Sequence, residues 1–326
     1  MHSMTPVVST RLSVRDVLGD WKVRWGIGRN RYRVTPGLFA VGKPTPQSPV
    51  LVTANYKLTF DKLRAELSDI DAWILVLDTK GVNVWCAAGK GTFGTRELEQ
   101  RVLSVGLEGI VFHRTLILPQ LGATGVSAPQ VQRETGWRVV FGPVRARDLR
   151  EFLANGLKKN TSMRKVEFRL SDRMALAPIE IVKSWPFLLG AAAGSAILAL
   201  PFDGGYPGRL MGFGMPLIGA VLAATIAFPA LLPILPFRAF SLKGAVMGAA
   251  WGVVASLLVR AHPAGSFAFV IVAAAVAAFL GMNFTGSTTF TCQTGAELEV
   301  RWGTIPMIVG LALGAGLLTV SRVLGI

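Results

Sequence analysis

Hydrophobic residues follow two different patterns along the chain, and the change from one to the other lies near Ser184. Up to residue 183, short apolar segments alternate with polar ones, whereas the remainder consists of long, nearly uninterrupted apolar runs. About 20 apolar residues in a helix are enough to cross the hydrocarbon core of a bilayer. Five such runs are predicted to be transmembrane helices: 185–202, 210–237, 242–259, 267–282 and 305–323.

The first 183 residues have the alternation of strands and helices that is typical of an α/β domain. Strands are expected at 50–54, 73–78, 109–112, 138–141 and 166–170. Helices are expected between them, for example at 61–69, 95–105 and 147–155. Open α/β sheets bind ligands at the carboxyl ends of their strands, so the loops that follow these strands are candidate binding loops.

The hydropathy change predicts a soluble part (1–183) followed by a membrane domain of about five helices (184–326). Residues 1–183 hold 28 Lys and Arg against 16 Asp and Glu, so most of the net charge of +15 lies there. Residues 1–20 lack the apolar core of a signal peptide. The positive-inside rule then favours an inner (cytoplasmic) membrane protein, multi-pass, with the N-terminal domain in the cytoplasm.

The membrane half contains small residues at the spacing that lets helices approach closely, namely Gly190 and Gly194, Gly244, Gly248 and Gly252, and Gly310 and Gly314. Ionisable residues are nearly absent from the predicted spans, which disfavours a transporter. The basic residues of the first half are spread out and form no aromatic-interleaved run, so lipid or a protein partner is expected and nucleic acid is not.

Residues 83–90 form the segment with the most specific chemistry. They follow the predicted buried strand 73–78 and a turn, Asn83 is a favoured N-cap, and Gly89 is a natural helix terminator. Cys86 would lie in the first turn, where the helix dipole favours a thiolate, and a thiolate binds soft metals. A buried structural cysteine is an equally reasonable interpretation of the spacing alone.

Composition limits what Cys86 can bind. The chain has two cysteines, Cys86 and Cys292, and three widely separated histidines. It cannot by itself build a four-cysteine iron–sulfur cluster or a Cys-x-x-Cys zinc site. A metal at Cys86 would therefore arrive in a macrocycle that carries its own equatorial ligands and needs one protein ligand.

The segment NVWCAAGK (83–90) resembles the cap-helix signature of the corrinoid protein family of microbial mercury methylation. Further segments that resemble this family are 36–42, 51–57, 116–123 and 281–287. Because the resemblance begins near residue 36, it implies an N-terminal extension (1–35) before an α/β domain (36–183) and the membrane domain (184–326). The soluble half is also similar, more distantly, to the corrinoid-binding domain of the corrinoid iron–sulfur protein. The resemblance implies an α/β Rossmann-like corrinoid-binding domain followed by an all-α transmembrane bundle.

The same resemblance implies a corrinoid-dependent methyltransferase, which carries a methyl group on cobalt and transfers it to inorganic Hg(II) to give methylmercury. The cofactor would be cobalamin or a related cobamide, with Cys86 as the catalytic residue and lower axial ligand of cobalt. The implied partners are a two-cluster ferredoxin-like electron donor, because this chain cannot hold a cluster, and a methyl donor such as methyltetrahydrofolate or its methyltransferase.

The loops after the predicted strands supply the expected corrinoid contacts. The candidate cofactor-binding residues are Thr53, Asn83, Val84, Trp85, Cys86, Ala87, Ala88, Gly89, Lys90, Gly91, Thr92, Gly122, Ala123, Gly142 and Pro143. Trp85 is either a core aromatic or a shield that keeps water from a cobalt–sulfur bond. Lys90 either caps a helix or stabilises the thiolate.

Two other functions stay open from the residues alone. One is a corrinoid methyl carrier with a different methyl acceptor, because the cap segment indicates cobalt ligation more directly than mercury chemistry. The other is a non-enzymatic membrane receptor or anchor in which Cys86 is structural. Cys292 lies in the loop 283–302, which is interpreted as a polar connector or a contact for the soluble domain or a partner.

Overall fold

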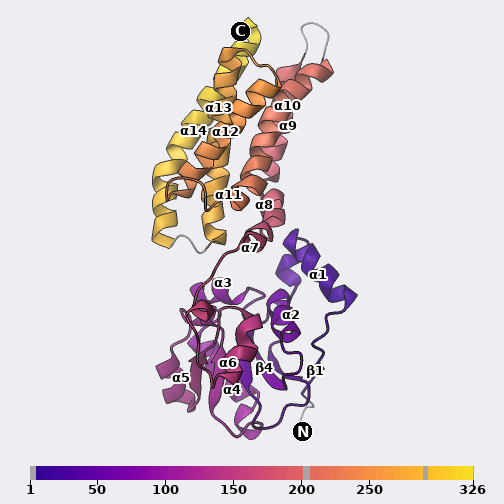
Figure 1. The fold of residues 1–326 in the computed structure, drawn as a ribbon, viewed down its shortest axis with the longest axis vertical. Helices are drawn as coiled ribbons and strands as arrows, with labels where there is room; N and C mark the ends of the chain where they lie inside the picture. The colour runs from indigo at the N-terminus through magenta and orange to yellow at the C-terminus, as the bar shows by residue number, and fades with distance from the viewer. Residues whose placement is uncertain (1–4, 201–205, 289–292, 326) are drawn as a thin grey trace. The chain divides into compact units, whose positions relative to one another are not determined.

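The computed structural model describes residues 5–200, 206–288 and 293–325, which form two compact units (Figure 1). Unit 1 extends to Val166 and unit 2 begins at Glu167. The segment 170–183, which the hydropathy pattern assigns to the soluble domain, belongs to unit 2.

Unit 1 is built around a six-stranded sheet with the strand order β1-β2-β4-β3-β5-β6. Its strands are β1 (Val7–Val8), β2 (Gly37–Val41), β3 (Val50–Ala54), β4 (Ala72–Leu77), β5 (Thr115–Leu118) and β6 (Arg138–Phe141). Its α-helices are α1 (Val14–Arg24), α2 (Lys57–Ala65), α3 (Val84–Gly89), α4 (Thr95–Ser104), α5 (Ala128–Thr135) and α6 (Leu149–Ala154). Its short 3-10 helices are η1 (Arg29–Arg31), η2 (Leu107–Gly109), η3 (Gln120–Gly122), η4 (Ala146–Asp148) and η5 (Ser162–Arg164).

Helices cover both faces of this sheet. Strands β4, β3, β5 and β6 are parallel, with Val50 of β3 paired to Trp73 of β4 and to Leu116 of β5. One buried cluster joins the sheet to α4 and α5 through Leu98, Val102 and Val131. A second cluster joins the opposite face to α2 and α6 through Phe60, Leu63, Leu149 and Phe152. The predicted fold class, an α/β domain followed by a helical region, is confirmed.

Two predicted strands are wrong. Residues 109–112 are the end of η2 and a turn, where Ile110 has helical dihedral angles, and the strand begins only at Thr115. Residues 166–170 form no strand, because Phe168 has a φ of 48° and α7 begins at Leu170. The sequence pattern also gave no sign of β2, which runs antiparallel to β4. β3 and β6 have the predicted bounds.

A group of paired charges attaches α1 to α2. Asp16 of α1 accepts hydrogen bonds from Nζ of Lys57 and, at 2.9 Å, from Nη2 of Arg64. Both cations also bind Asp61, which is fully buried. Arg64 further donates to the carbonyl oxygens of Ser9 and Arg11, so it holds the segment before α1 as well. These bonds attach the N-terminal segment firmly to unit 1.

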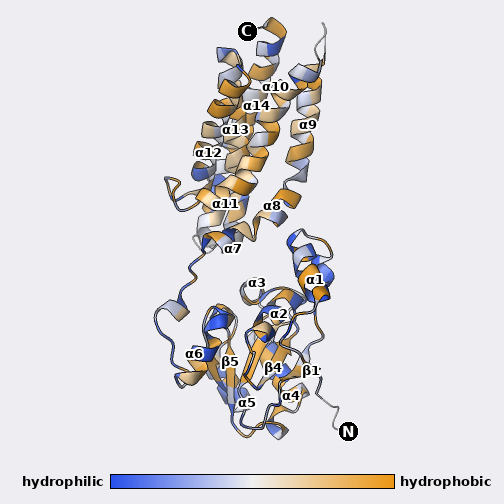
Figure 2. Cartoon of the chain, turned by 45° about the vertical axis from the view of Figure 1, so that its right-hand side comes forward, coloured by the Kyte–Doolittle hydropathy of each residue, from blue (hydrophilic) through white to orange (hydrophobic). Residues whose placement is uncertain are grey.

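Unit 2 consists of helices rich in apolar residues, which are drawn largely in orange in Figure 2. They are α7 (Leu170–Met174), α8 (Ala177–Lys183), α9 (Trp185–Ala199), α10 (Tyr206–Leu222), the π-helix η6 (Ala223–Ala227), α11 (Phe228–Leu231), α12 (Phe240–Leu258), α13 (Pro263–Asn283), the 3-10 helix η7 (Phe284–Ser287) and α14 (Gln293–Leu324). Among the described residues, four helices are long and apolar enough to cross a membrane: Pro207–Leu231, Phe240–Leu258, Pro263–Asn283 and Thr294–Leu324. A fifth is possible if Leu170–Lys183 and Trp185–Ala199, bent by 56°, form one span, which gives the predicted number.

The glycine series of α12 packs directly on α13, as its spacing predicts. A Cβ atom at Gly248 would lie 2.2 Å from the carbonyl oxygen of Ala273, and one at Gly244 would lie 2.2 Å from that of Ala277. Gly314 of α14 similarly approaches Val272. The pair Gly190 and Gly194 does not follow the prediction, because a Cβ atom there would meet nothing within 4 Å.

Replacing Gly248 with Leu is expected to destabilise the packing of α12 on α13, because the backbone of α13 occupies the space that the side chain needs. Overpacking of this kind costs about 1–3 kcal/mol. A fall in the thermal midpoint of the purified protein in detergent would measure the effect. Gly194→Leu is the matched control in α9, and an equal loss in both variants would contradict the close packing of α12 and α13.

The attachment of α1 is expected to weaken in acid. Burial alone would raise the pKa of Asp16, but hydrogen bonds from Lys57, Ser13 and Arg64 outweigh burial and hold this pKa well below its usual range. A depressed pKa contributes stability above the unfolded value, about 3.9 for Asp, and this contribution is lost as the pH falls through the folded value. Amide exchange of α1, corrected for intrinsic rates, should therefore accelerate below about pH 4. Asp16→Asn should exchange faster already at neutral pH, while Glu134→Gln on the exposed side of α5 should match the native protein.

Candidate functional site

The strand order of unit 1 creates a switch point at the carboxyl ends of β3 and β5. From β3 the chain crosses to β4 on one side, and from β4 it returns past β3 to β5 on the other side. Ligands of open α/β sheets bind where the connections diverge in this way. α3 follows β4 and lies at this point, because it contacts both η3, which follows β5, and β3 (Figure 1).

The carboxamide of Asn55 organises the loop that leads into α3. Asn55 directly follows β3 and is 1% exposed. Its Oδ1 atom accepts hydrogen bonds from the backbone N–H groups of Thr79 (3.1 Å) and Gly81 (2.9 Å) and from Oγ1 of Thr79 (2.9 Å). Its Nδ2 atom donates to Asp78 at 3.1 Å. These bonds join the end of β3 to the β4–α3 loop and fix the point from which α3 begins.

Asp78 stays charged in this network. Burial alone would raise the pKa of Asp78, but hydrogen bonds from Lys80 and Asn55 outweigh burial and lower it. The backbone N–H of Asp78 donates to Oε1 of Glu97 on α4 at 2.8 Å. The end of β4 is therefore bound both to its neighbouring strand and to the helix that covers it.

α3 begins and ends as the sequence predicts. Asn83 has extended dihedral angles, and its Oδ1 atom accepts a hydrogen bond from the backbone N–H of Cys86 at 3.0 Å. This confirms the N-cap and places Cys86 in the first turn. The helix ends at Gly89, with Lys90 exposed just beyond it.

The two sides of α3 differ in burial. Val84, Ala87 and Ala88 are buried in the cluster that joins the sheet to α4 and α5. At about 100° per residue, Cys86 lies on the side away from these three residues. Cys86 is partly exposed and Trp85 is 37% exposed. The thiol therefore belongs to the outward side of α3 rather than to the hydrophobic core.

Glycines bring the loop after β5 into close contact with the segment that follows α3. A Cβ atom at Gly125 would lie 2.1 Å from the carbonyl oxygen of Phe93 and 3.0 Å from Cα of Ala88. One at Gly122 would lie 2.5 Å from the ring of Phe93. The backbone N–H groups of Thr92 and Phe93 both donate to the carbonyl oxygen of Ala87. Side chains at these glycines would force the loop away from α3.

The remaining predicted residues are distributed unevenly around α3. Gly91 and Thr92 continue directly from it, and Gly122 and Ala123 lie in the η3 loop that packs against it. Gly142 and Pro143 follow β6 and are buried, and a 3.5 Å hydrogen bond from N of Gln120 to O of Pro143 links them to η3. Thr53 is buried in β3 and alternates with Val52 and Ala54, so its side chain lies on the opposite face of the sheet.

Two polar residues at this edge are absent from the sequence-based set. One is Asn55, whose position directly after the predicted strand 50–54 is a usable signal in the sequence. Lys159 comes from the segment after α6, and its Nζ atom donates to Oε1 of Gln120 in η3. Burial and the neighbouring Arg164 lower the pKa of Lys159. No local sequence feature indicates this contact, because it depends on how the chain returns after β6.

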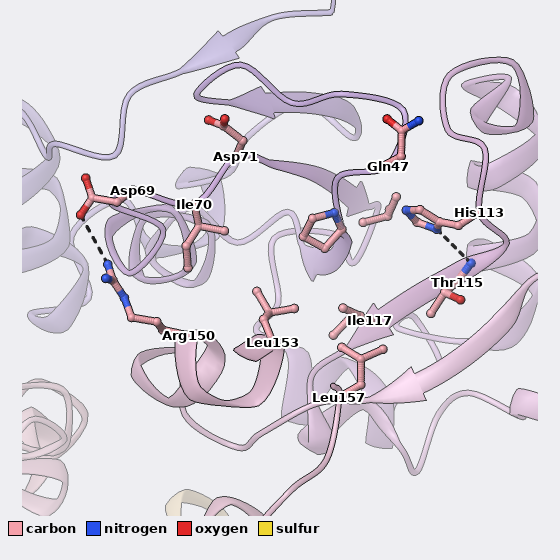
Figure 3. A pocket seen from close by; sticks show the side chains of 12 residues that line it. Gln47, Asp69, Ile70, Asp71, His113, Thr115, Ile117, Arg150, Leu153 and Leu157 are labelled. Atoms are coloured by element: carbon pink, nitrogen blue, oxygen red, sulfur yellow. Dashed lines mark hydrogen bonds and ion pairs between the residues drawn. The ribbon is translucent and has the colours of Figure 1, made fainter. Parts of the chain in front are cut away.

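A separate cavity of about 590 Å³ lies at the amino ends of the same strands, where Val50 and Thr115 begin β3 and β5. Figure 3 shows Arg150 paired with Asp69 at the rim and Leu153 and Leu157 near Ile117. His113 receives a hydrogen bond from the N–H of Thr115 at 3.3 Å. None of the predicted site residues lines this cavity, so it is distinct from the α3 edge.

Within residues 5–200, 206–288 and 293–325, no group of three or more His, Cys, Asp and Glu side chains is placed to hold a metal ion. Cys292 lies outside the described residues, and so does part of the loop 283–302. The free thiol that the described residues place on the outward side of α3 is that of Cys86.

Residues 27–153 match the family model described as CO dehydrogenase/acetyl-CoA synthase delta subunit. The acetyl-CoA decarbonylase/synthase complex subunit gamma of Methanopyrus kandleri is 36% identical over 127 residues, which cover 38% of this chain and 27% of that protein.

The corresponding subunit of Archaeoglobus fulgidus is 35% identical over 118 residues, covering 36% of this chain and 25% of that protein. The corrinoid/iron-sulfur protein large subunit of Moorella thermoacetica is 32% identical over 113 residues, covering 34% and 25%. The matched region thus spans about a quarter of each relative. Residues 27–153, which include α3 and the loops around it, are therefore similar to the CO dehydrogenase/acetyl-CoA synthase delta subunit family and to part of the corrinoid/iron-sulfur protein large subunit.

Proposed function

We propose that this chain is a corrinoid-dependent methyltransferase that transfers a methyl group to inorganic Hg(II) and produces methylmercury. It would be anchored in the cytoplasmic membrane by the apolar helices of unit 2, with unit 1 in the cytoplasm. The observation that carries the proposal is the position of Cys86: a partly exposed thiol in the first turn of a capped helix, at the switch point of an open α/β sheet.

The donor set at this edge suits a corrinoid. A corrinoid brings four equatorial nitrogen ligands, so the protein needs to supply one axial donor, and Cys86 is a single donor on the outward side of α3. The name of the Moorella relative also refers to a corrinoid. When bound, the corrinoid would supply the cobalt that accepts and releases the methyl group.

The residues around Cys86 hold the thiol in place. Asn83 binds the backbone N–H of Cys86, and Asn55 fixes the loop from which α3 begins. Rigid support of this kind orients a metal ligand and tunes the metal, as outer-shell partners do in other sites. Trp85 directly precedes Cys86 and would exclude water from the thiol, and exposed Lys90 follows the end of the same helix.

A thiolate donor also suits the chemistry proposed for mercury. Thiolate is strongly electron-donating, and the identity of the axial ligand is a main way in which a protein tunes its cofactor. Held by the Cys86 thiolate, the corrinoid would supply a methyl group together with its bonding electrons, which a soft acceptor such as Hg(II) can take. The likeness of residues 83–90 to the mercury-methylation family supports this acceptor.

The proposed partners follow from what the cycle consumes. Returning cobalt to its low-valent state needs low-potential electrons, for which we propose a two-cluster ferredoxin-like donor. The methyl group would come from methyltetrahydrofolate or its methyltransferase, or a related donor. Membrane lipid would surround the four or five spans of unit 2.

A second candidate is a corrinoid methyl carrier with a different acceptor. The observation that favours it is the similarity of residues 27–153 to subunits of acetyl-CoA decarbonylase/synthase complexes, none of which is named for mercury. Both candidates use Cys86 in the same way and differ in the molecule that receives the methyl group.

Replacing Cys86 with Ala is expected to abolish methyl transfer, because the axial donor is lost. Outer-shell changes alone lower metal affinity or activity 10–100-fold, so loss of the ligand should cost about a hundredfold or more. The measurement is methylmercury formed from Hg(II) by anaerobic cells that produce this chain with a two-cluster ferredoxin partner. Thr124→Ala, at an exposed residue of the neighbouring loop, is the control that should keep native activity.

The absorption spectrum of the purified protein separates the possible outcomes. A corrinoid spectrum that changes in Cys86→Ala, together with loss of methylmercury, supports the proposal. Native protein that is loaded with corrinoid but forms no methylmercury would favour the carrier with another acceptor. Native protein that binds no corrinoid would overturn both candidates.

Gly125→Ala tests whether the close approach of the β5–α5 loop is needed for the site. The added methyl group would meet the backbone of Phe93, so the loop must move away from α3. We expect at least about a tenfold loss of corrinoid affinity, measured by titration of the apoprotein, with the sheet intact by circular dichroism. Gly109→Ala is the matched control, because a Cβ atom at Gly109 meets nothing within 4 Å, and equal affinities in the two variants would contradict this role.

A further inference from the structure

The polarity of α1 is inverted relative to an ordinary surface helix. Its carboxylates point inward, where Asp16 pairs with Lys57 and Arg64 and Asp20 accepts a 3.1 Å hydrogen bond from the hydroxyl of Tyr32. Val23 near its end is buried, but the other large apolar residues of α1 point outward. The exposed fractions are 75% for Val14, 54% for Val17, 52% for Leu18 and 58% for Trp21.

These apolar residues form one continuous stripe. At about 100° per residue, Val14, Val17, Leu18 and Trp21 fall within an arc of about 100°, and Trp25 falls inside the same arc. The rings of Trp21 and Trp25 are 6.0 Å apart, so the two indoles contact each other along the stripe. Scattered single apolar residues are normal on a protein surface, but a continuous stripe of this kind marks an interaction surface.

Basic residues border the stripe on both sides. In the same projection, Arg15 and Lys22 flank one side and Arg24 flanks the other. Arg15 and Lys22 are exposed. Residues 1–35 contain seven Lys and Arg against two acidic residues, Asp16 and Asp20, and α1 turns both of these inward.

We propose that α1 is an interfacial helix that binds the surface of an anionic lipid bilayer, with the Val14–Val17–Leu18–Trp21 stripe in the headgroup region and Arg15 and Lys22 on the lipid phosphates. Helices that lie in the plane of a membrane combine an apolar face containing Trp with basic residues beside it. The indole rings of Trp side chains are enriched in membrane proteins at the depth of the lipid headgroups. Each basic residue near an anionic surface contributes attraction that corresponds to about a fivefold change in binding.

Charge argues for lipid over a second copy of the chain. Two α1 stripes packed face to face would bring like-charged borders together, which disfavours that pairing. An anionic bilayer instead complements the basic borders. The chain itself also links unit 1 to a bilayer. The short segment 165–169 joins unit 1 covalently to helices with the length and composition of membrane spans.

The anchorage of α1 connects this surface to the edge that holds Cys86. Lys57 begins α2 directly beyond the end of β3, and its backbone N–H donates to the carbonyl oxygen of Tyr32 at 3.0 Å. The N–H of Val34 donates to the carbonyl oxygen of Asn55 at 2.9 Å. Figure 1 accordingly shows α1 and α3 toward the same end of unit 1. A bilayer bound at α1 would therefore lie near the entrance to the α3 edge.

The test is photo-crosslinking of the full chain, in nanodiscs, with p-benzoylphenylalanine in place of Leu18. Nanodiscs of phosphatidylcholine alone are compared with nanodiscs that also contain phosphatidylglycerol, and adducts are identified by mass. We expect a lipid adduct that increases with phosphatidylglycerol. Arg15→Gln and Lys22→Gln should each lower it about fivefold.

Position 134, exposed on α5, carries the same photoreactive group as a control and should give no lipid adduct. The group at Val17 provides a second position on the stripe if the Leu18 variant fails to fold. Absence of a lipid adduct from both stripe positions, or an adduct with a second protein chain instead, would overturn the proposal. The outcome does not depend on corrinoid or mercury, so it is independent of the proposed methyl transfer.

Discussion

The hydrogen bonds of one buried carboxamide determine the geometry of the candidate site. Asn55 directly follows β3 at the centre of the sheet, and its Oδ1 atom accepts three hydrogen bonds from Thr79 and Gly81 in the loop that leads into α3. Without this acceptor, the buried donors of the loop would be left unsatisfied, at a cost of roughly 1–3 kcal/mol each. The loop therefore has little freedom to adopt another path. The position of Cys86 is fixed with the loop, because Asn83 at the end of the loop caps α3 by a hydrogen bond to the backbone N–H of Cys86.

Close backbone packing is the second condition that the site requires. α3 has only six residues, too few to be stable as an isolated helix, so it depends on its neighbours. Its inner side is held by the hydrophobic cluster, and its end is held by the loop containing Gly122 and Gly125. The outward side, with the partly exposed Cys86 and Trp85, contributes little to these contacts. A short helix supported on one side only can present an outward-facing thiol while its backbone stays fixed.

Much of this arrangement was predictable from local sequence patterns, and the exceptions have physical causes. The strand 50–54, the N-cap Asn83 and the glycine spacing of α12 depend on near neighbours, and the structure confirms them. β2 was not predicted. It pairs antiparallel with β4, which lies about 30 residues further along the chain, so its local sequence does not reveal the pairing. The false strand at 166–170 has apolar β-formers, but the backbone of Phe168 turns into the left-handed region. Lys159 reaches η3 only through the path of the chain after β6, which no local pattern reveals.

The inverted helix α1 shows how charge pairing can decide which side of a helix faces outward. Burying Val17 and Trp21 would be favourable by area alone, since a large apolar side chain gains about 1.5–3 kcal/mol on burial. Asp61, however, is fully buried and needs the cations Lys57 and Arg64, and these cations in turn need Asp16. Turning α1 over would separate Asp16 from them and leave buried charges without compensation, which costs about 3–5 kcal/mol for a broken pair. The ion pairs thus keep the apolar stripe on the outside, where a lipid surface can provide the burial that unit 1 does not.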